Sequence, residues 1–239
     1  MNTMDVLKEA LEVLRRGGVI LYPTDTVWGI GCDATNPEAV ARVFEIKRRS
    51  EAKSLVLLAS DLDMVARYVR QIPNIAIDLV EVNDRPMTLI YPGAICGTAP
   101  AGLVRSDAVP ANAVQNGPIC TCEGKKMSAE VQNGPSGTCK AGDKYHLAWN
   151  TVAEDGSVGI RIPLPGFWLD LVARLGRPLV STSANISGEP TPKRFSEISE
   201  EIRGTVDYCV PASLERGSTG SASQIIKVGL GGEVEIIRA

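Results

Sequence analysis

Two hydroxyl-rich segments, far apart in the sequence, each follow a short apolar run. In the first, residues 19–21 precede Pro23 and the Thr-Asp-Thr cluster at 24–26; in the second, residues 178–180 precede STSANISG at 181–188. Ligands of α/β proteins bind outside strand ends, where small polar side chains and free N–H groups converge. We therefore expect both segments to contribute to one small-molecule site. The alternative is that each is a structural turn, whose polar side chains bond only to their own backbone.

A basic cluster follows the pattern of a helix that begins at Asn36. Lys47, Arg48 and Arg49 stand at its end, with Lys53 a few residues on. Lys47 continues the inward stripe of this helix, so its ammonium needs either solvent or an anion at the rim of the core. Arginine suits bidentate contact with phosphate, and lysine acts as a point charge. The cluster is thus a candidate phosphate site, although a solvated basic patch at a helix end is the usual outcome for such a run.

Hydrophobic periodicity predicts the elements that hold these groups. The helical patterns lie at residues 7–14, 36–47, 62–69, 75–82, 165–175 and, weakly, 198–202. The strand patterns lie at residues 19–21, 27–31, 54–59, 86–91, 157–163, 178–182 and 206–210, with a hairpin that joins 224–228 to 234–237. This alternation indicates an α/β fold in one domain, residues 1–239.

The regular pattern is interrupted between about residues 94 and 152. This stretch is rich in Gly, Pro, Asn, Ala and Thr, and it contains a near-repeat, VQNGPICTC from Val114 and VQNGPSGTC from Val131. Such composition predicts an irregular insertion. Cys120, Cys122 and Cys139, with His146, have the side chains that bind zinc, but their spacing matches no recognised zinc knuckle. We therefore assign no metal site.

Composition restricts the class of protein. The chain has 239 residues, of which 44% are hydrophobic, and a net charge of -3. It can bury one sizeable core. The N-terminus lacks the features of a signal peptide, and no apolar run approaches membrane-spanning length, so we expect a cytoplasmic protein with reduced cysteines and no membrane partner. The weak net charge disfavours a dedicated polyanion binder, although a local basic cluster can still hold phosphates.

Four motifs, taken in order, closely resemble the YrdC-like (TsaC) family of threonylcarbamoyl-AMP synthases. They are GGVILYPTDTVWGIG, the Lys47-x-Arg49 pair with Lys53, SVGIRIP and STSANISG. The resemblance runs from Met4 to about Gly93 and from Ala153 to Arg238. It implies a twisted, mixed α/β sheet with flanking helices and a concave basic cleft.

The same resemblance implies an enzyme, a nucleotidyltransferase. Its substrates would be L-threonine, bicarbonate and ATP with Mg²⁺, and its products threonylcarbamoyl-AMP and pyrophosphate. The product would serve tRNA threonylcarbamoyladenosine formation, which makes RNA and the downstream tRNA threonylcarbamoyltransferase further candidate partners. The work required of the protein is mainly positioning, charge neutralisation and exclusion of water.

The resemblance also assigns the site. Lys47 and Arg49 would be the catalytic cations that hold the triphosphate. Threonine would be bound by Thr24, Arg161, Ser181 and Ser223, with the arginine paired to the threonine carboxylate. ATP would be bound, beside that pair of cations, by Lys53, Ser157, Ser183, Asn185 and Arg238. No cysteine or histidine nucleophile is needed.

Two alternatives remain open. A catalytically silent relative could use the same basic cleft to hold a nucleotide or RNA, because cations that face phosphate do not by themselves prove turnover. A second alternative is carbamoyl transfer to a different acceptor, as in related domains of hydrogenase-maturation proteins.

Overall fold

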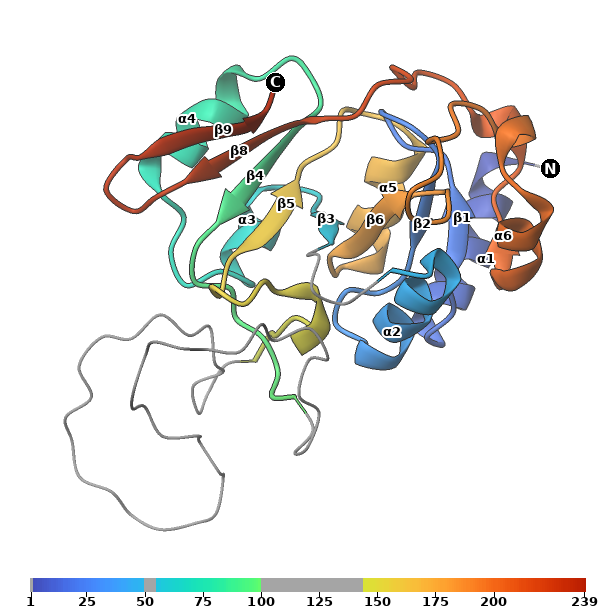
Figure 1. Ribbon diagram of the computed structural model, residues 1–239, viewed down its shortest axis with the longest axis horizontal. Helices are drawn as coiled ribbons and strands as arrows, with labels where there is room; N and C mark the ends of the chain where they lie inside the picture. The colour runs from blue at the N-terminus through green and yellow to red at the C-terminus, as the bar shows by residue number, and fades with distance from the viewer. Residues whose placement is uncertain (1, 50–54, 100–143) are drawn as a thin grey trace, which may run out of the picture.

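The computed structural model describes residues 2–49, 55–99 and 144–239, and the strands in these ranges form one mixed sheet (Figure 1). The strand order is β7-β1-β2-β6-β3-β5-β4-β8-β9. The strands are β1 (Ile20–Tyr22), β2 (Gly29–Gly31), β3 (Val56–Leu58), β4 (Met87–Tyr91), β5 (Val158–Arg161), β6 (Leu179–Ser183), β7 (Tyr208–Cys209), β8 (Gln224–Val228) and β9 (Val234–Arg238). The mixed α/β sheet predicted from the sequence is confirmed.

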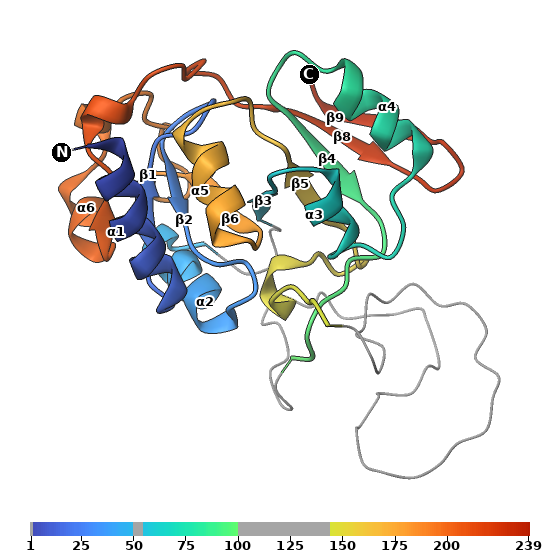
Figure 2. The same cartoon turned by 180° about the vertical axis from the view of Figure 1, so that it is seen from behind.

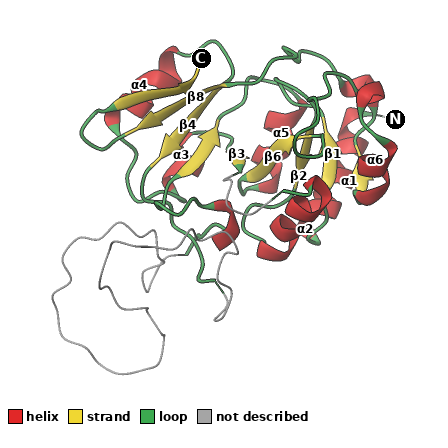
Figure 3. Ribbon diagram, viewed as in Figure 1, coloured by secondary structure: helices red, strands yellow, loops and turns green. Residues whose placement is uncertain are grey.

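Helices cover the two faces of this sheet unequally. The helices are α1 (Thr3–Arg15), α2 (Pro37–Lys47), α3 (Leu62–Ala66), α4 (Asn74–Val82), α5 (Phe167–Leu175) and α6 (Glu200–Thr205). Figure 2 shows α1, α3, α4 and α5 in front of the sheet, and Figure 1 shows α2 in front of its other face. Figure 3 shows that long loops run over the face that carries α2.

The sheet brings the two hydroxyl-rich segments together. Strand β2 pairs antiparallel with both β1 and β6, so β1 and β6 run in the same direction. In this register Gly29 lies opposite Tyr22 on one side and opposite Ser183 on the other. The loop after β1 and the loop after β6 consequently leave the same edge of the sheet, as the sequence predicted.

Residues at both ends of the predicted insertion pack into the core of the protein. Leu147 is fully buried and pairs with Cys96, while the amide of Gly97 donates to the Leu147 carbonyl at 2.8 Å. The Ala148 amide donates to the Ala34 carbonyl at 2.8 Å. These flanking residues show no hydrophobic periodicity in the sequence, yet they belong to the core. A few long-range contacts hold them in place. Cys120, Cys122 and Cys139 lie outside the described residues.

Helix α3 is also shorter than predicted. The apolar pattern at 62–69 indicated one helix, but α3 ends at Ala66 and Val69 instead forms an isolated β-bridge with Ala94. The bridge to Ala94, a tertiary contact, has overridden the weak helical pattern of this segment. In the described ranges, no helix combines the length and the apolar character needed to cross a membrane.

Replacing residues 100–143 with a linker of about eight residues is expected to leave cooperative unfolding intact. Cys96 and Leu147 are bridge partners. Residues 99 and 144, the two ends to be joined, are each only a few residues, roughly 10 Å of chain, from that bridge. Extending the deletion to residues 94–150 removes Leu147 and Ala148 from the core and is expected to cost at least about 3 kcal/mol. Thermal unfolding measures the stability of both variants. An equal loss of stability in the two would contradict this prediction.

Candidate active site

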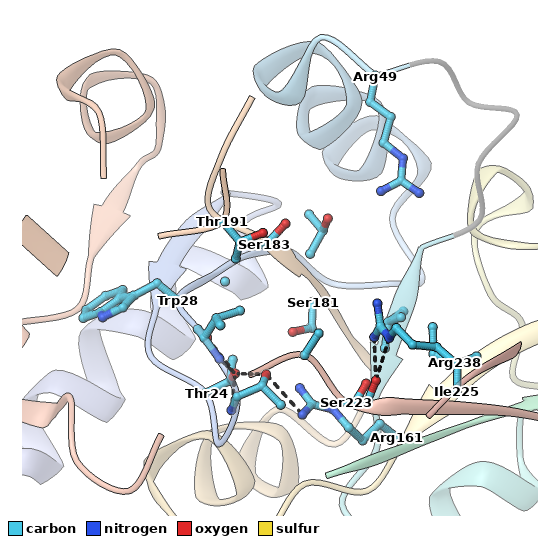
Figure 4. A pocket seen from close by; sticks show the side chains of 16 residues that line it. Thr24, Trp28, Arg49, Arg161, Ser181, Ser183, Thr191, Ser223, Ile225 and Arg238 are labelled. Atoms are coloured by element: carbon cyan, nitrogen blue, oxygen red, sulfur yellow. Dashed lines mark hydrogen bonds between the residues drawn. The ribbon is translucent and has the colours of Figure 1, made fainter. Parts of the chain in front are cut away.

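A cavity of about 300 Å³, lined by both polar and apolar groups, lies on the face of the sheet that carries α2 (Figure 4). Its lining comes from segments that span most of the chain: Thr24, Thr26, Val27, Trp28, Gly29, Arg49, Val56, Arg161, Ser181, Thr182, Ser183, Thr191, Ala222, Ser223, Ile225 and Arg238. This volume is at the lower end of the range for small-molecule sites. Seven of the site residues predicted from the sequence are in this lining: Thr24, Arg49, Arg161, Ser181, Ser183, Ser223 and Arg238.

The floor of the cavity is the sheet itself. Ser181 and Ser183 are two residues apart on β6, so their side chains face the same side of the sheet. Val56 on β3 lies directly opposite Ser181. The site therefore extends over the face of the sheet and is not confined to the strand ends, which differs from the prediction. The twist of a long sheet makes such a face concave.

The loop after β1 forms one wall. The hydroxyl of Thr24 lies 2.8 Å from that of Thr26, donates to the Val27 carbonyl at 2.7 Å, and accepts from the Thr26 amide at 3.1 Å. The loop is tied down from outside as well, since the Gly220 amide donates to the Thr26 carbonyl at 2.8 Å. Thr24 is only 1% exposed. Its hydroxyl is thus held in a fixed position at the cavity.

Arg161, at the end of β5, is held by a carboxylate that the sequence analysis left without a role. Its Nη1 donates to Asp25 Oδ1 at 2.7 Å and to Thr26 Oγ1 at 3.3 Å, and Asp25 also accepts from the Leu164 amide at 3.1 Å. Burial lowers the pKa of Arg161, and the Asp25 carboxylate opposes that shift. Arg161 Nε is buried without a hydrogen-bond partner among the described residues. The guanidinium therefore has hydrogen-bonding capacity beyond its bond to Asp25.

Arg49 reaches the cavity because of how α2 ends. Asn36 caps the start of the helix through its side chain, and Pro37 occupies the first turn. At the other end Arg48 has a φ of 48°, in the left-handed region. The chain turns there, and Figure 4 shows the Arg49 guanidinium directed toward the cavity from the helix end. The Arg48 side chain instead forms an exposed ion pair with Glu201.

Lys47 and Asn185 lie beside the cavity without lining it. The Lys47 ammonium donates to the carbonyl oxygens of Ser183 and Asn185, the latter at 2.7 Å. The hydroxyl of Ser183 in turn donates to Asn185 Oδ1 at 2.5 Å. Thr24, Arg49 and Asn185, predicted to gather around one site, are therefore close neighbours of the same cavity.

The far wall comes from β8 and β9. The guanidinium of Arg238 donates to the Ser223 carbonyl through Nε at 2.9 Å and through Nη2 at 2.6 Å. The Ser223 hydroxyl lies 2.8 Å from that of Thr88 on β4, and both side chains are buried. Figure 4 shows Arg238 and Ser223 on the opposite side of the cavity from Trp28. The wall is thus fixed by hydrogen bonds within the sheet.

One predicted residue, Ser157, is not brought to the cavity, another lies outside the described residues, and two further residues were missed. Ser157 is outside the lining, and its hydroxyl donates to Asp155 at 2.5 Å. Lys53 lies outside the described residues. Thr191 is in the lining although nothing in the sequence marks it. Asp25 was noted only as part of the first polar cluster. The signal for its ion pair with Arg161 was a carboxylate next to a buried strand together with a lone arginine in the strand SVGIRIP.

The electrostatics of the cavity favour anions. Its lining contains the guanidinium groups of Arg49, Arg161 and Arg238 and, in the part of the chain that is described, no carboxylate. Asp25 lies behind Arg161 and balances only that charge. The remaining polar side chains of the lining are mainly those of serine and threonine. Such a site can hold a phosphate chain and a carboxylate at the same time.

The fold is a mixed α/β sheet with an arginine-lined, hydroxyl-rich cavity on one face, an arrangement that suits small anionic molecules. The chain belongs to the Sua5/YciO/YrdC family, whose model, described as "Telomere recombination", matches residues 12–107 and 120–239.

Curated relatives agree with this family. A threonylcarbamoyl-AMP synthase of Stenotrophomonas maltophilia is 30% identical over 218 residues, which covers 91% of this chain and 89% of the relative. A protein of the same name from Xanthomonas euvesicatoria is 30% identical over 224 residues, which covers 93% of this chain and 91% of the relative.

Solved structures share the fold. The Sua5 protein of P. abyssi, crystallised with L-threonine, superposes with a TM-score of 0.65 at 21% identity, over 95% of this chain and 52% of that chain. This chain therefore spans about half the length of that Sua5 protein. YciO of E. coli gives a TM-score of 0.63 at 18% identity, over 99% of this chain and 89% of that chain.

Proposed function

We propose that the chain is a threonylcarbamoyl-AMP synthase. The observation that carries the proposal is the single cavity in which Thr24, Arg49 and Arg161 come together from remote parts of the sequence. The curated relatives bear this name, and the P. abyssi neighbour was crystallised with L-threonine. We place the enzyme in the cytoplasm, with the downstream tRNA threonylcarbamoyltransferase, and RNA itself, as its further partners.

The proposed reaction has two balanced steps. The amine of threonine displaces hydroxide from the carbon of bicarbonate and loses a proton, which gives the N-carboxylate and one water molecule. An oxygen of this carboxylate then attacks the α-phosphorus of ATP, and the bond to the β-phosphate oxygen breaks to release pyrophosphate. The N-carboxylate is labile, so the protein must hold both substrates together and keep water out.

The residues of the cavity suit these steps. Arg49 would neutralise the triphosphate as charge builds up on the leaving pyrophosphate. Arg161 would pair with the threonine carboxylate, with the Thr24 and Ser181 hydroxyls as hydrogen-bond partners of the amino acid. Ser183 and Arg238 would lie along the nucleotide. Arginine fits both groups, because its planar guanidinium binds carboxylate and phosphate in a bidentate manner.

Magnesium would enter as part of the substrate, MgATP. Among the described residues, no group of three or more His, Cys, Asp or Glu side chains could hold a metal ion. The carboxylate of Asp25, which touches the lining residue Arg161, is already bonded to that arginine and to the Leu164 amide. The phosphates of ATP, rather than a protein site, would therefore supply the ligands of the ion.

The test is pyrophosphate release by the purified chain with MgATP, bicarbonate and isotopically labelled threonine. We expect release that requires both threonine and bicarbonate, with the label in a threonylcarbamoyl adenylate. No threonine-dependent release, together with intact binding of ATP or RNA, would instead identify a silent binding relative. Release that depends on a different carbamoyl acceptor would contradict the substrate assignment.

A further inference from the structure

Lys47 is a buried lysine whose charge is fully engaged by the protein. It is the last residue of α2, and it is only 2% exposed, on the same inward face as Val43 and Phe44. Its ammonium emerges from this apolar surface among oxygen atoms of the loop after β6. They are the carbonyl oxygens of Ser183 and Asn185 and, at 3.4 Å, the side-chain Oδ1 of Asn185.

These acceptors match what a lysine can donate. An ammonium group has three N–H bonds and no acceptor, and here three oxygen atoms surround it. Burial, and to a lesser extent Arg49, lower the pKa of Lys47 to about 8, so the charged form still predominates at neutral pH. Hydrogen bonds from a charged donor are the strong ones. While the loop keeps this conformation, no N–H of Lys47 is left for a phosphate.

The main chain of Lys47 makes a second connection to the same loop. The Ser187 amide donates to the Lys47 carbonyl at 2.9 Å. The Lys47 side chain therefore holds the beginning of the loop, at Ser183 and Asn185, and the Lys47 backbone holds its end, at Ser187. Ser183, the first residue so held, lies in the cavity lining. The conformation of this part of the cavity wall thus depends on the end of α2.

Arg49 behaves differently although it is only two residues away. The left-handed turn at Arg48 separates the two side chains. The Arg49 guanidinium is directed toward the cavity (Figure 4) and belongs to its lining, whereas Lys47 does not. The two cations of the Lys47-x-Arg49 pair are therefore placed for different tasks.

We propose that Lys47 is a positioning residue, which fixes the Ser183–Ser187 loop against the end of α2, and that Arg49 alone of this pair contacts the phosphates. The effect on catalysis rests on the proposed function. The fixing of the loop does not, and it can be measured on the free protein.

The first test compares Lys47→Met, which keeps the length and apolar stem of the side chain, with the matched variant Arg49→Met. Backbone hydrogen exchange is followed without substrates, after circular dichroism has shown that both variants are folded. In Lys47→Met we expect exchange in peptides covering residues 183–189 to be about tenfold faster or more, with exchange in α1 unchanged. In Arg49→Met we expect the loop to exchange at the wild-type rate. An unchanged loop in Lys47→Met would overturn the proposal.

Wild-type protein gives a second readout that does not depend on a variant's folding. In brief labelling with acetic anhydride, Lys47 is expected to react at least ten times more slowly than the exposed Lys8 and Lys193. Labelling at the rate of those lysines would mean that the ammonium is not held by the loop, and would contradict the proposal.

Steady-state kinetics separate the two roles further. Arg49→Met is expected to raise the KM for ATP at least tenfold, whereas Lys47→Met is expected mainly to lower kcat, with the KM for ATP changed by less than about threefold. An equal rise in the KM for ATP in both variants would assign Lys47 to the phosphates. If neither variant nor the wild type turned over, the proposed function would fail, while the exchange and labelling results would still decide the role of Lys47.

Discussion

Replacing Arg161 with methionine is expected to abolish threonine-dependent pyrophosphate release and to destabilise the fold by about 3–5 kcal/mol. The destabilisation follows because the substitution leaves the Asp25 carboxylate buried and unpaired. Asp25 is 0% exposed and Arg161 is 4% exposed, so solvent cannot replace the lost partner. For a chain of this size, the loss corresponds to a decrease in Tm of roughly 6–20 °C. Thermal unfolding and the pyrophosphate assay measure the two effects.

A double variant separates stability from chemistry at this ion pair. Asp25→Asn combined with Arg161→Met removes both charges and keeps an oxygen that can accept from the Leu164 amide. Because removing a buried pair costs far less than breaking it, most of the lost stability should return. Activity should not return, since the threonine carboxylate would still lack its cation. A double variant as unstable as Arg161→Met would show that the ion pair does not carry the effect.

Replacing Arg49 with alanine is expected to reduce kcat/KM for ATP by about 10- to 150-fold, with a much smaller effect on stability. A hydrogen bond to a charged group is worth about 1.5–3 kcal/mol, and each 1.36 kcal/mol corresponds to a factor of ten. Arg49 is half-buried at the rim, where a triphosphate would be more exposed than the threonine. Initial rates at varied MgATP measure the change.

The neighbouring arginine provides the matched control. Arg48 carries the same charge, but its side chain is exposed and pairs with Glu201 on the surface. Arg48→Gly removes that charge and suits the positive φ of this position. We expect kcat/KM for ATP to stay within about threefold of the wild-type value, because exposed ion pairs contribute little. Equal losses at Arg48 and Arg49 would mean that the general basic charge matters rather than a directed contact.

The sequence predicted the parts of the site that follow a local pattern. Thr24 follows the apolar strand β1 and Ser183 is the last residue of β6, so strand order alone brings them to the same end of the sheet. Arg49 follows a helix whose start Asn36 and Pro37 mark in the sequence. In each case the residue that matters is close in sequence to the element that positions it.

Residues whose surroundings are built by remote segments could not be placed in this way. The partner of Arg161 is 136 residues away, and no spacing rule links it to Asp25. Lys47 was predicted at the rim of the core, but the carbonyl oxygens that engage it depend on the path of a loop after β6. Ala94 and Leu147 are buried and form isolated bridges to Val69 and Cys96. Neither residue belongs to a periodic hydrophobic pattern in the sequence.

The most direct measurement is a crystal structure with L-threonine and a non-hydrolysable MgATP analogue. We predict that both ligands occupy the cavity that contains Thr24, with the triphosphate against Arg49, the threonine carboxylate against Arg161, and Lys47 still bonded to the loop after β6. Threonine or the nucleotide bound outside this cavity, or a threonine carboxylate that does not contact Arg161, would contradict it.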